Sequence, residues 1–213
     1  MTSSSSATGS SRDVVLASAS PRRHDLLRRA GVEFRIVPAD VDETIDATLD
    51  ATAVAEDLAL RKARAVAGRP EGAGALVLGS DTLVVLGEDG DPERRFLEKA
   101  GEEREAREML GALSGSRHRV ITGVAVVDAV GGGEFASHEV TWVTMRPLGA
   151  EELEAYVLSG EWRGKAGAYA IQETADRFVT NLEGGGFDNV VGLPVGLTLE
   201  LLRGAREGSR PGS

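Results

Sequence analysis

The sequence predicts an α/β protein, because short apolar runs typical of buried strands alternate with segments whose apolar residues have helical spacing. The strand runs include residues 14–16 and 75–79. The clearest helix is residues 51–67, which are rich in Ala, Leu, Arg and Lys. At 213 residues, the chain is long enough for one sizeable core or two small lobes.

Composition narrows the classes of function. The formal net charge of −10 disfavours binding to long DNA or RNA, since nonspecific nucleic-acid binders are usually basic. The absence of cysteine excludes disulfides, thiolate chemistry and cysteine-type zinc sites, and it fits a reducing cytoplasm. No apolar run approaches the ~18 residues of a membrane span, so we expect no membrane partner.

The chain divides into three parts by composition. Residues 1–12 predict a disordered arm, because the first eleven are mostly Ser, Thr, Ala and Gly and lack the apolar segment of a signal peptide. Residues 13–203 hold all the periodic segments and predict one folded domain. Residues 204–213 predict a flexible polar tail.

The first strand leads into a helix through a polar turn that contains Ser18. Ser20 is a suitable N-cap, and Pro21 fits the first helical position. Together with Arg22 and Arg23, a helix N-terminus of this kind can bind a polyphosphate. A capped surface helix with solvated arginines explains this stretch equally well.

The second predicted strand, residues 34–37, is followed by an acidic turn. Asp40, Asp42 and Glu43 lie close together there and could hold a divalent metal or activate water. A solvated acidic loop is the commoner explanation of such a run. In the helix that follows, Lys62 is near the apolar side, so its charge either reaches to the surface or points into a pocket.

Asp81 lies between two strongly apolar runs, residues 75–79 and 83–86. A carboxylate at such a point must be exposed at a strand end, paired, or bound to metal. Ligands of α/β sheets bind at strand ends, so we expect Asp81 at a strand end and in a functional role.

The later elements follow from the same signals, and the lone His118 among them is expected to be structural. They are a hairpin of residues 83–86 with 96–97, a helix at 102–113, strands at 118–127 and 139–145 joined by a Gly-rich turn, a helix at 151–158, a strand at 178–182 and a last helix at 194–202.

Residues 165–172 combine a lysine, small residues and Gln172. Small residues let backbones approach closely, and a planar amide can read the edge of a base. Chemistry alone favours a plainer interpretation, a strand with an exposed glutamine.

Cations beside carboxylates are the usual ingredients of phosphoryl or nucleotidyl chemistry with Mg²⁺. The sequence contains no Walker-type phosphate loop, no G-x-G-x-x-G after a strand and no evident Ser/His/acid arrangement. These three classes of enzyme are therefore disfavoured.

The chain resembles the Maf family of nucleoside triphosphate pyrophosphatases, once described as septum-formation inhibitors. The matching segments appear in family order between residues 14 and 202. They are residues 16–23 (LASASPRR), 42–44 (DET), 62–63 (KA), 79–83 (GSDTL), 113–123 (LSG, then His118, Val120, Thr122 and Gly123), 165–172 (KAGAYAIQ) and 189–194 (NVVGLP).

The resemblance implies hydrolysis of a nucleoside triphosphate to the monophosphate and pyrophosphate with a divalent metal, Mg²⁺ or Mn²⁺. It implies an ITPase-like fold, with an elongated mixed sheet flanked by helices and two lobes around a cleft. Residues 165–172 resemble the branch that acts on dTTP and UTP. The family further suggests a homodimer in the cytoplasm.

The resemblance also implies roles for single residues. The catalytic set would be Asp81, Glu43 and Lys62, with Asp81 as proton acceptor and the two carboxylates as metal ligands. Substrate specificity would be set by Arg22, Thr82 and Gln172. Phosphates would be contacted by Ser20, Arg23, Lys62, Lys99 and Lys165.

Two departures from the family pattern concern substrate preference. Ala100 follows Lys99 where the family usually has proline, and Glu173 follows Gln172 where it has glycine. An alternative from another class is a nucleotide-binding regulator of cell division with weak or no hydrolysis. The presence of Asp81, Glu43 and Lys62 favours a working enzyme.

Overall fold

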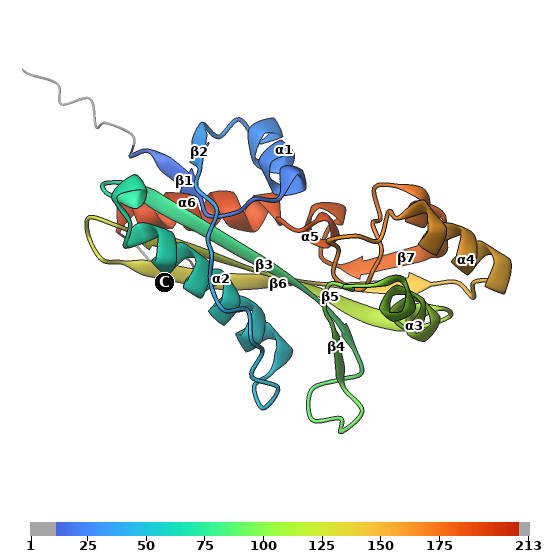
Figure 1. The fold of residues 1–213 in the computed structure, drawn as a ribbon. Coiled ribbons are helices and arrows are strands. Elements are labelled where there is room, and N and C mark those ends of the chain that lie inside the picture. The colour runs from blue at the N-terminus through green and yellow to red at the C-terminus, as the bar shows by residue number, and fades with distance from the viewer. Residues whose placement is uncertain (1–11, 209–213) are drawn as a thin grey trace, which may run out of the picture.

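A seven-stranded mixed β-sheet with helices on both faces forms the fold of residues 12–208, the part of the chain that the computed structural model describes (Figure 1). The predicted α/β class and elongated mixed sheet are confirmed. The arm predicted for residues 1–12 lies outside the described residues except for Arg12. Of the tail predicted for residues 204–213, residues 209–213 lie outside them, while residues 204–207 belong to the last helix and not to a tail.

Three long strands run through the length of the molecule. The strands are β1 (Val14–Leu16), β2 (Phe34–Ile36), β3 (Leu76–Leu86), β4 (Arg95–Leu97), β5 (Arg117–Asp128), β6 (Glu134–Met145) and β7 (Val179–Gly184). The helices are α1 (Pro21–Arg29), α2 (Ala51–Ala67), α3 (Glu103–Leu113), α4 (Ala150–Ser159), α5 (Phe187–Val191) and α6 (Val195–Glu207), with short 3₁₀ turns at Pro70–Gly72 and Thr174–Phe178.

Strand β3 is paired differently along its two edges. The strand order is β2-β1-β3-β5-β6-β7, and β4 also pairs with β3. One edge of β3 is covered by β5 from Leu76 to Val85. The other edge pairs with β1 up to Leu78 and with β4 only from Val84, so the ladder is open between these two residues.

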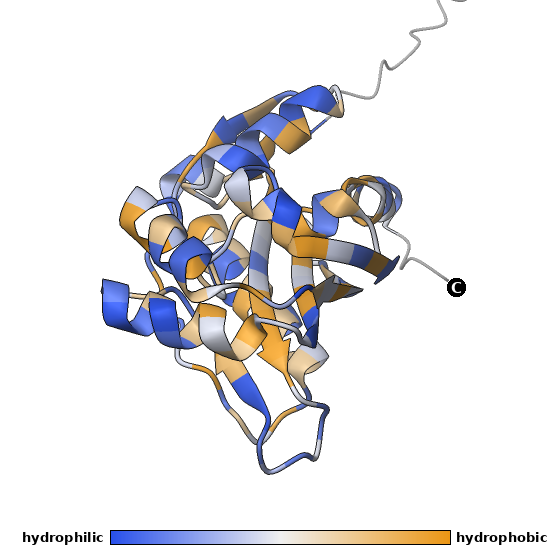
Figure 2. Ribbon diagram, turned by 90° about the vertical axis from the view of Figure 1, so that its right-hand side faces the viewer, coloured by the Kyte–Doolittle hydropathy of each residue, from blue (hydrophilic) through white to orange (hydrophobic). Residues whose placement is uncertain are grey.

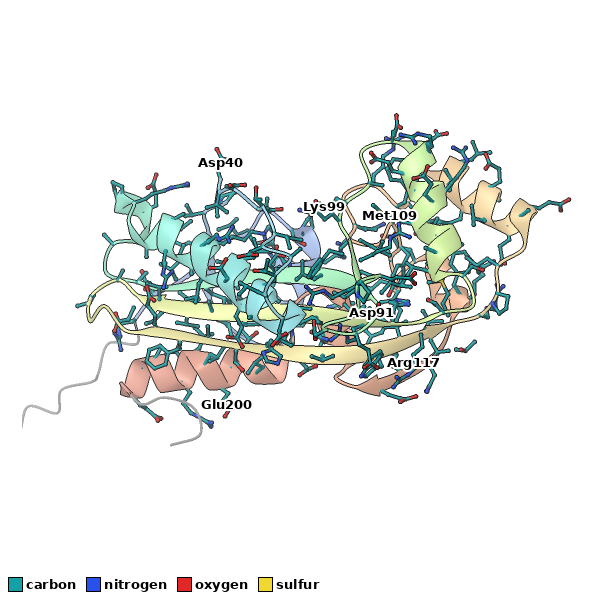
Figure 3. All side chains as sticks on the ribbon, turned by 90° about the horizontal axis from the view of Figure 1, so that it is seen from below. Asp40, Asp91, Lys99, Met109, Arg117 and Glu200 are labelled. Carbon is teal, nitrogen blue, oxygen red and sulfur yellow. The ribbon has the colours of Figure 1, made fainter. Side chains whose placement is uncertain are left out.

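Helices α2 and α6 cover opposite faces of the sheet at one end, as Figure 3 shows. Apolar residues gather on the central strands, where the helices bury them (Figure 2). Helices α3 and α4 form a separate core at the other end, around the buried Trp162 and Phe178. The open part of β3 lies between these two groups of helices, in agreement with the predicted two lobes.

Two glycines let α2 lie directly on the sheet backbone. A Cβ atom at Gly79 would stand 2.2 Å from the carbonyl oxygen of Ala59, and one at Gly123 would stand 2.0 Å from that of Ala55. No larger residue fits these positions without moving the helix, so both glycines set its height above the strands.

Several elements match the prediction. Helix α2 has the predicted bounds, β4 forms the predicted hairpin with β3, and β5 and β6 pair across the predicted Gly-rich turn. Two predicted bounds are too short. Strand β6 begins at Glu134, and α6 continues to Glu207 because Gly204 and Ala205 are buried against the sheet.

Two further predictions are wrong. Asp81 does not lie at a strand end, because β3 runs without a break from Leu76 to Leu86 and both apolar runs belong to it. The alternative of a strand before Gln172 is also wrong, since residues 162–172 form turns. Helix α5 has no counterpart in the predicted elements.

Between residues 12 and 208, no helix has the length and apolar content needed to cross a bilayer.

The turn between β3 and β4 holds the start of α2. Asp89 accepts hydrogen bonds from the N–H of Ala51, the first residue of α2 (3.0 Å), and from Arg94 and Arg119 (2.6 Å each). The hydrogen bond from Arg119 is the largest cause that lowers the pKa of Asp89 from 3.8 to about 2. Asp89 thus acts as an N-cap supplied from another part of the chain.

We predict that Asp89→Asn lowers the free energy of unfolding by ~1 kcal/mol near neutral pH, a value reduced for the partial exposure of this carboxylate. Folding lowers the pKa of Asp89, so its contribution is complete above about pH 4 and disappears as the pH falls toward about 2. Urea unfolding measured over this pH range should show that the free energies of unfolding of the unmodified protein and Asp89→Asn become equal in acid.

The matched control for this prediction is Glu88→Gln, an exposed neighbour in the same turn whose side chain makes no hydrogen bond with residues 12–208. It should change stability little at any pH. A stability difference for Asp89→Asn that persists unchanged into acid would contradict the assigned ion pairs.

Candidate active site

A cavity of about 520 Å³ opens at the unpaired part of β3. Its walls come from the turn before α1, from α2, β3 and Lys99, and from residues 163–172. All ten predicted site residues line this one cavity. They are Ser20, Arg22, Arg23, Glu43, Lys62, Asp81, Thr82, Lys99, Lys165 and Gln172.

Lys62 joins the two predicted catalytic carboxylates. Its ammonium pairs with Asp81 and lies 2.7 Å from Glu43 Oε1. Only 6% of Lys62 is exposed, so the charge points into the pocket and the surface-reaching alternative is wrong. Helix α2 packs directly against Gly79. Asp81 is two residues after Gly79 in β3 and lies on the same face of the sheet, so this packing brings Lys62 of α2 close to Asp81.

Glu43 bridges two lysines. Its second oxygen lies 3.2 Å from Lys99 Nζ. Burial by itself raises the pKa of Glu43, but the hydrogen bonds and charges of Lys62 and Lys99 outweigh this and hold the pKa below its ordinary value. The site therefore keeps Glu43 ionised at neutral pH.

The other acids of the predicted acidic turn do not join the site. Asp42 accepts a hydrogen bond from the N–H of Thr44 (2.9 Å), and Asp40 points away from the molecule (Figure 3). In residues 12–208, no group of three or more His, Cys, Asp or Glu side chains is placed to hold a metal. A metal cluster made by the turn itself is therefore wrong.

Glu43 and Asp81 nevertheless fit a metal that is shared with a substrate. Both carboxylates reach one ammonium, so they lie close together. Mg²⁺ is commonly held by one or two carboxylates together with water and substrate phosphates. The protein side of such a site is present in these two residues.

Arg23 connects α1 to the sheet. It donates to Gly192 O (2.8 Å), to Thr82 Oγ1 (3.1 Å) and to Ser18 Oγ (3.3 Å). Burial lowers the pKa of this guanidinium, and the charge of Asp81 opposes that effect. Three of its five N–H groups are used in this way, which fixes the orientation of the remaining two at the cavity.

Thr82 is held from both sides through its hydroxyl. Besides accepting from Arg23, its Oγ1 lies 3.1 Å from that of Thr122, which in turn donates to Asn189 O (2.9 Å). The hydroxyl of Thr82 is therefore already engaged within the protein.

Arg22 differs from its neighbour Arg23. It lines the cavity, but its guanidinium makes no hydrogen bond or ion pair with any residue between 12 and 208. Burial lowers the pKa of Arg22, and the charge of Glu173 opposes this. The two arginines therefore have different environments, one engaged and one available.

Lys165 is also paired. It donates to Glu161 O and lies 2.7 Å from Glu173 Oε2, the residue that stands where the family pattern has glycine. The carboxylate of Glu161 accepts from Thr174 N (3.1 Å) and Oγ1 (2.7 Å), which closes the segment on itself. Gln172, between these contacts, is exposed.

The turn after Lys165 has a constrained backbone. Gly167 and Ala168 both have positive φ, 68° and 59°. A Cβ at Gly167 would lie 2.9 Å from Val84, so glycine is required there. Left-handed backbone at Ala168 is strained and is held by the surrounding structure.

His118 supports this turn from beneath. It is fully buried, and its Nε2 lies 2.9 Å from the hydroxyl of Tyr169, which lines the cavity. Burial lowers the pKa of His118 to about 4, so the ring is neutral at physiological pH. The predicted structural role agrees with this position.

Arg163 is a cavity residue that is not among the predicted site residues. It lines the cavity and stacks over Trp162, with 4.6 Å between its guanidinium carbon and the ring centroid. A cation two residues before Lys165 in a Gly-containing segment was the available signal. Nothing in the local sequence indicates the buried contacts of Thr122 and Asn189, since both depend on tertiary packing.

Known proteins similar to this chain cover nearly its whole length. The chain matches the family of Maf-like proteins over residues 13–205. A protein of Pelotomaculum thermopropionicum named dTTP/UTP pyrophosphatase is 46% identical over 192 residues, 90% of this chain and 96% of the relative. One of the same name from Moorella thermoacetica is 49% identical over 189 residues, 89% and 93% of the two chains.

The matched region includes every segment that lines the cavity, from the turn before α1 to the residues after β7. A match of this extent, together with relatives of 46% and 49% identity over about nine tenths of the sequence, shows that the chain belongs to the Maf family.

Proposed function

We propose that this protein hydrolyses dTTP and UTP to the monophosphate and pyrophosphate. The observation that carries the proposal is the meeting of Asp81, Lys62 and Glu43 in a cavity that also holds cations and a free amide. Its volume of about 520 Å³ suits a nucleotide-sized ligand. Relatives named dTTP/UTP pyrophosphatase support the choice of substrates.

The reaction needs a base for water and positive charge for the leaving group. Asp81 accepts a proton from a water whose oxygen bonds to the α-phosphorus, and the bond from that phosphorus to the bridging oxygen breaks. Lys62, Lys99 and Lys165 balance the charge that pyrophosphate carries away. Ser20 and Arg23 hold the phosphates at the helix N-terminus.

A divalent metal, Mg²⁺ or Mn²⁺, would be held by Glu43 and Asp81 with oxygens of the triphosphate, and when bound it supplies neutralisation of developing charge. Arg22, Thr82 and Gln172 set specificity in this proposal. A cytoplasmic location and a homodimer remain predictions from the family resemblance.

We predict that Asp81→Asn lowers kcat for UTP by ~10²–10⁴-fold, because the amide cannot accept the proton. Pyrophosphate release with UTP, dTTP, CTP, ATP and GTP, with and without Mg²⁺, measures this. Asp91→Asn, in the exposed turn after β3, is the control. Full activity of Asp81→Asn, with thermal unfolding showing a folded protein, would rule out the assigned base.

Tight nucleotide binding by the unmodified protein without hydrolysis of any of these substrates would instead favour the regulator of cell division.

Gln172→Ala should reduce discrimination between pyrimidine and purine triphosphates, since the exposed amide lines the cavity without a partner in residues 12–208. We expect the UTP to GTP ratio of kcat/KM to fall by ~10-fold, about the value of one hydrogen bond. Asp176→Asn, exposed on the same segment, should leave the ratio unchanged. An unaltered ratio in Gln172→Ala would exclude its reading the base.

Glu173→Gln should lower the KM for UTP, because Lys165 no longer has to leave a carboxylate to meet a phosphate. We expect a ~2- to 10-fold effect at low ionic strength that shrinks at high salt. Glu88→Gln again serves as the distant control. A higher KM would show that Glu173 orders Lys165 for the substrate and does not compete with it.

A further inference from the structure

The open edge of β3 presents backbone groups to the cavity. In a strand, the N–H and C=O of alternate residues point to the same edge. Leu76 N donates to Asp13 O (2.9 Å) and Leu78 O accepts from Ala17 N (2.8 Å). The even-numbered residues of β3 therefore point their backbone groups toward β1 and β4, which includes Ser80 and Thr82.

These two residues have no backbone partners there. After Ala17 the chain leaves β3 for α1, and Lys99, which follows β4, pairs with Ala166 instead. Within residues 12–208, no hydrogen bond reaches the N–H or C=O of Ser80 or Thr82 from this side. Ser80 is fully buried, whereas Thr82 is half-buried and lines the cavity.

The backbone of Thr82 thus offers a donor beside an acceptor, while its hydroxyl is already engaged by Arg23 and Thr122. A phosphate has only acceptors and would be opposed by the C=O. A carbonyl next to an N–H, as in the imide edge of a pyrimidine, would satisfy both groups.

Uracil and thymine carry this imide, a carbonyl beside N3–H. Cytosine has a bare N3 acceptor and an amino group at the corresponding atoms. The 5-methyl group and the sugar 2′-hydroxyl, which distinguish dTTP from UTP, lie off this edge. A binding site that recognises the imide edge therefore accepts both dTTP and UTP and rejects CTP.

We infer that the backbone N–H and C=O of Thr82, on the open edge of β3, recognise the imide edge of the uracil or thymine base. This inference rests on the proposed function. It makes Thr82 a specificity residue through its main chain, whichever side chain stands there.

Substrate analogues test the inference directly. We expect 5-methyl-UTP to be hydrolysed like UTP. N3-methyl-UTP and CTP should each show a ~10- to 100-fold lower kcat/KM, because each leaves the backbone pair unsatisfied. Replacing the main-chain amide nitrogen of Thr82 by an ester oxygen removes the proposed N–H donor. This change should lower kcat/KM for UTP and reduce the ratio of kcat/KM for UTP to that for N3-methyl-UTP.

Thr82→Val separates the main chain from the hydroxyl. It should keep the ratio of UTP to CTP activity within ~3-fold, even if overall activity falls through loss of the contacts with Arg23 and Thr122. Collapse of that ratio would assign recognition to the hydroxyl and overturn the inference.

Hydrolysis of UTP and of N3-methyl-UTP together distinguishes loss of the proposed activity from loss of imide recognition. If neither UTP nor dTTP is hydrolysed, the proposed function is wrong. If UTP is hydrolysed and N3-methyl-UTP is hydrolysed equally well, the function stands and the imide reading is wrong.

Discussion

The break in the ladder along one edge of β3 is the constraint on which the site depends. Strand β5 pairs with the opposite edge from Leu76 to Val85, so β3 is continuous through Asp81. On the open edge, the chain leaves after β1 to form α1 and leaves again after β4 to meet Ala166. These departures create the cavity and bring its phosphate-binding and base-binding candidates to one place.

The lysines of this cavity are already paired with carboxylates before any ligand enters, whereas the arginines that line it, Arg22, Arg23 and Arg163, form no ion pair within residues 12–208. Each of its three lysines has a carboxylate partner: Lys62 has Asp81 and Glu43, Lys99 has Glu43, and Lys165 has Glu173. When a triphosphate binds, its phosphates therefore replace carboxylates as the partners of these lysines.

Much of this could be predicted from the sequence, since α2 and the β3–β4 hairpin have strong local signals and the motifs of the cavity stand in family order. The misplacement of Asp81 has a physical cause. A polar triplet between two apolar runs resembles the end of a strand, and only pairing with β5 shows that the strand continues. Likewise, Arg163 lines the cavity because of the direction that the chain takes in a turn, and the spacing of residues along the sequence does not predict that direction.

The glycines beneath α2 have a consequence for inherited variation. Gly79 and Gly123 have no functional group, and neither is among the residues that line the cavity. Yet a single added methyl at either one would lift α2 from the strands and draw the Lys62 ammonium away from Asp81. Loss-of-function alleles of such an enzyme should therefore occur at these two glycines, which have no functional group, as well as at the charged residues of the cavity.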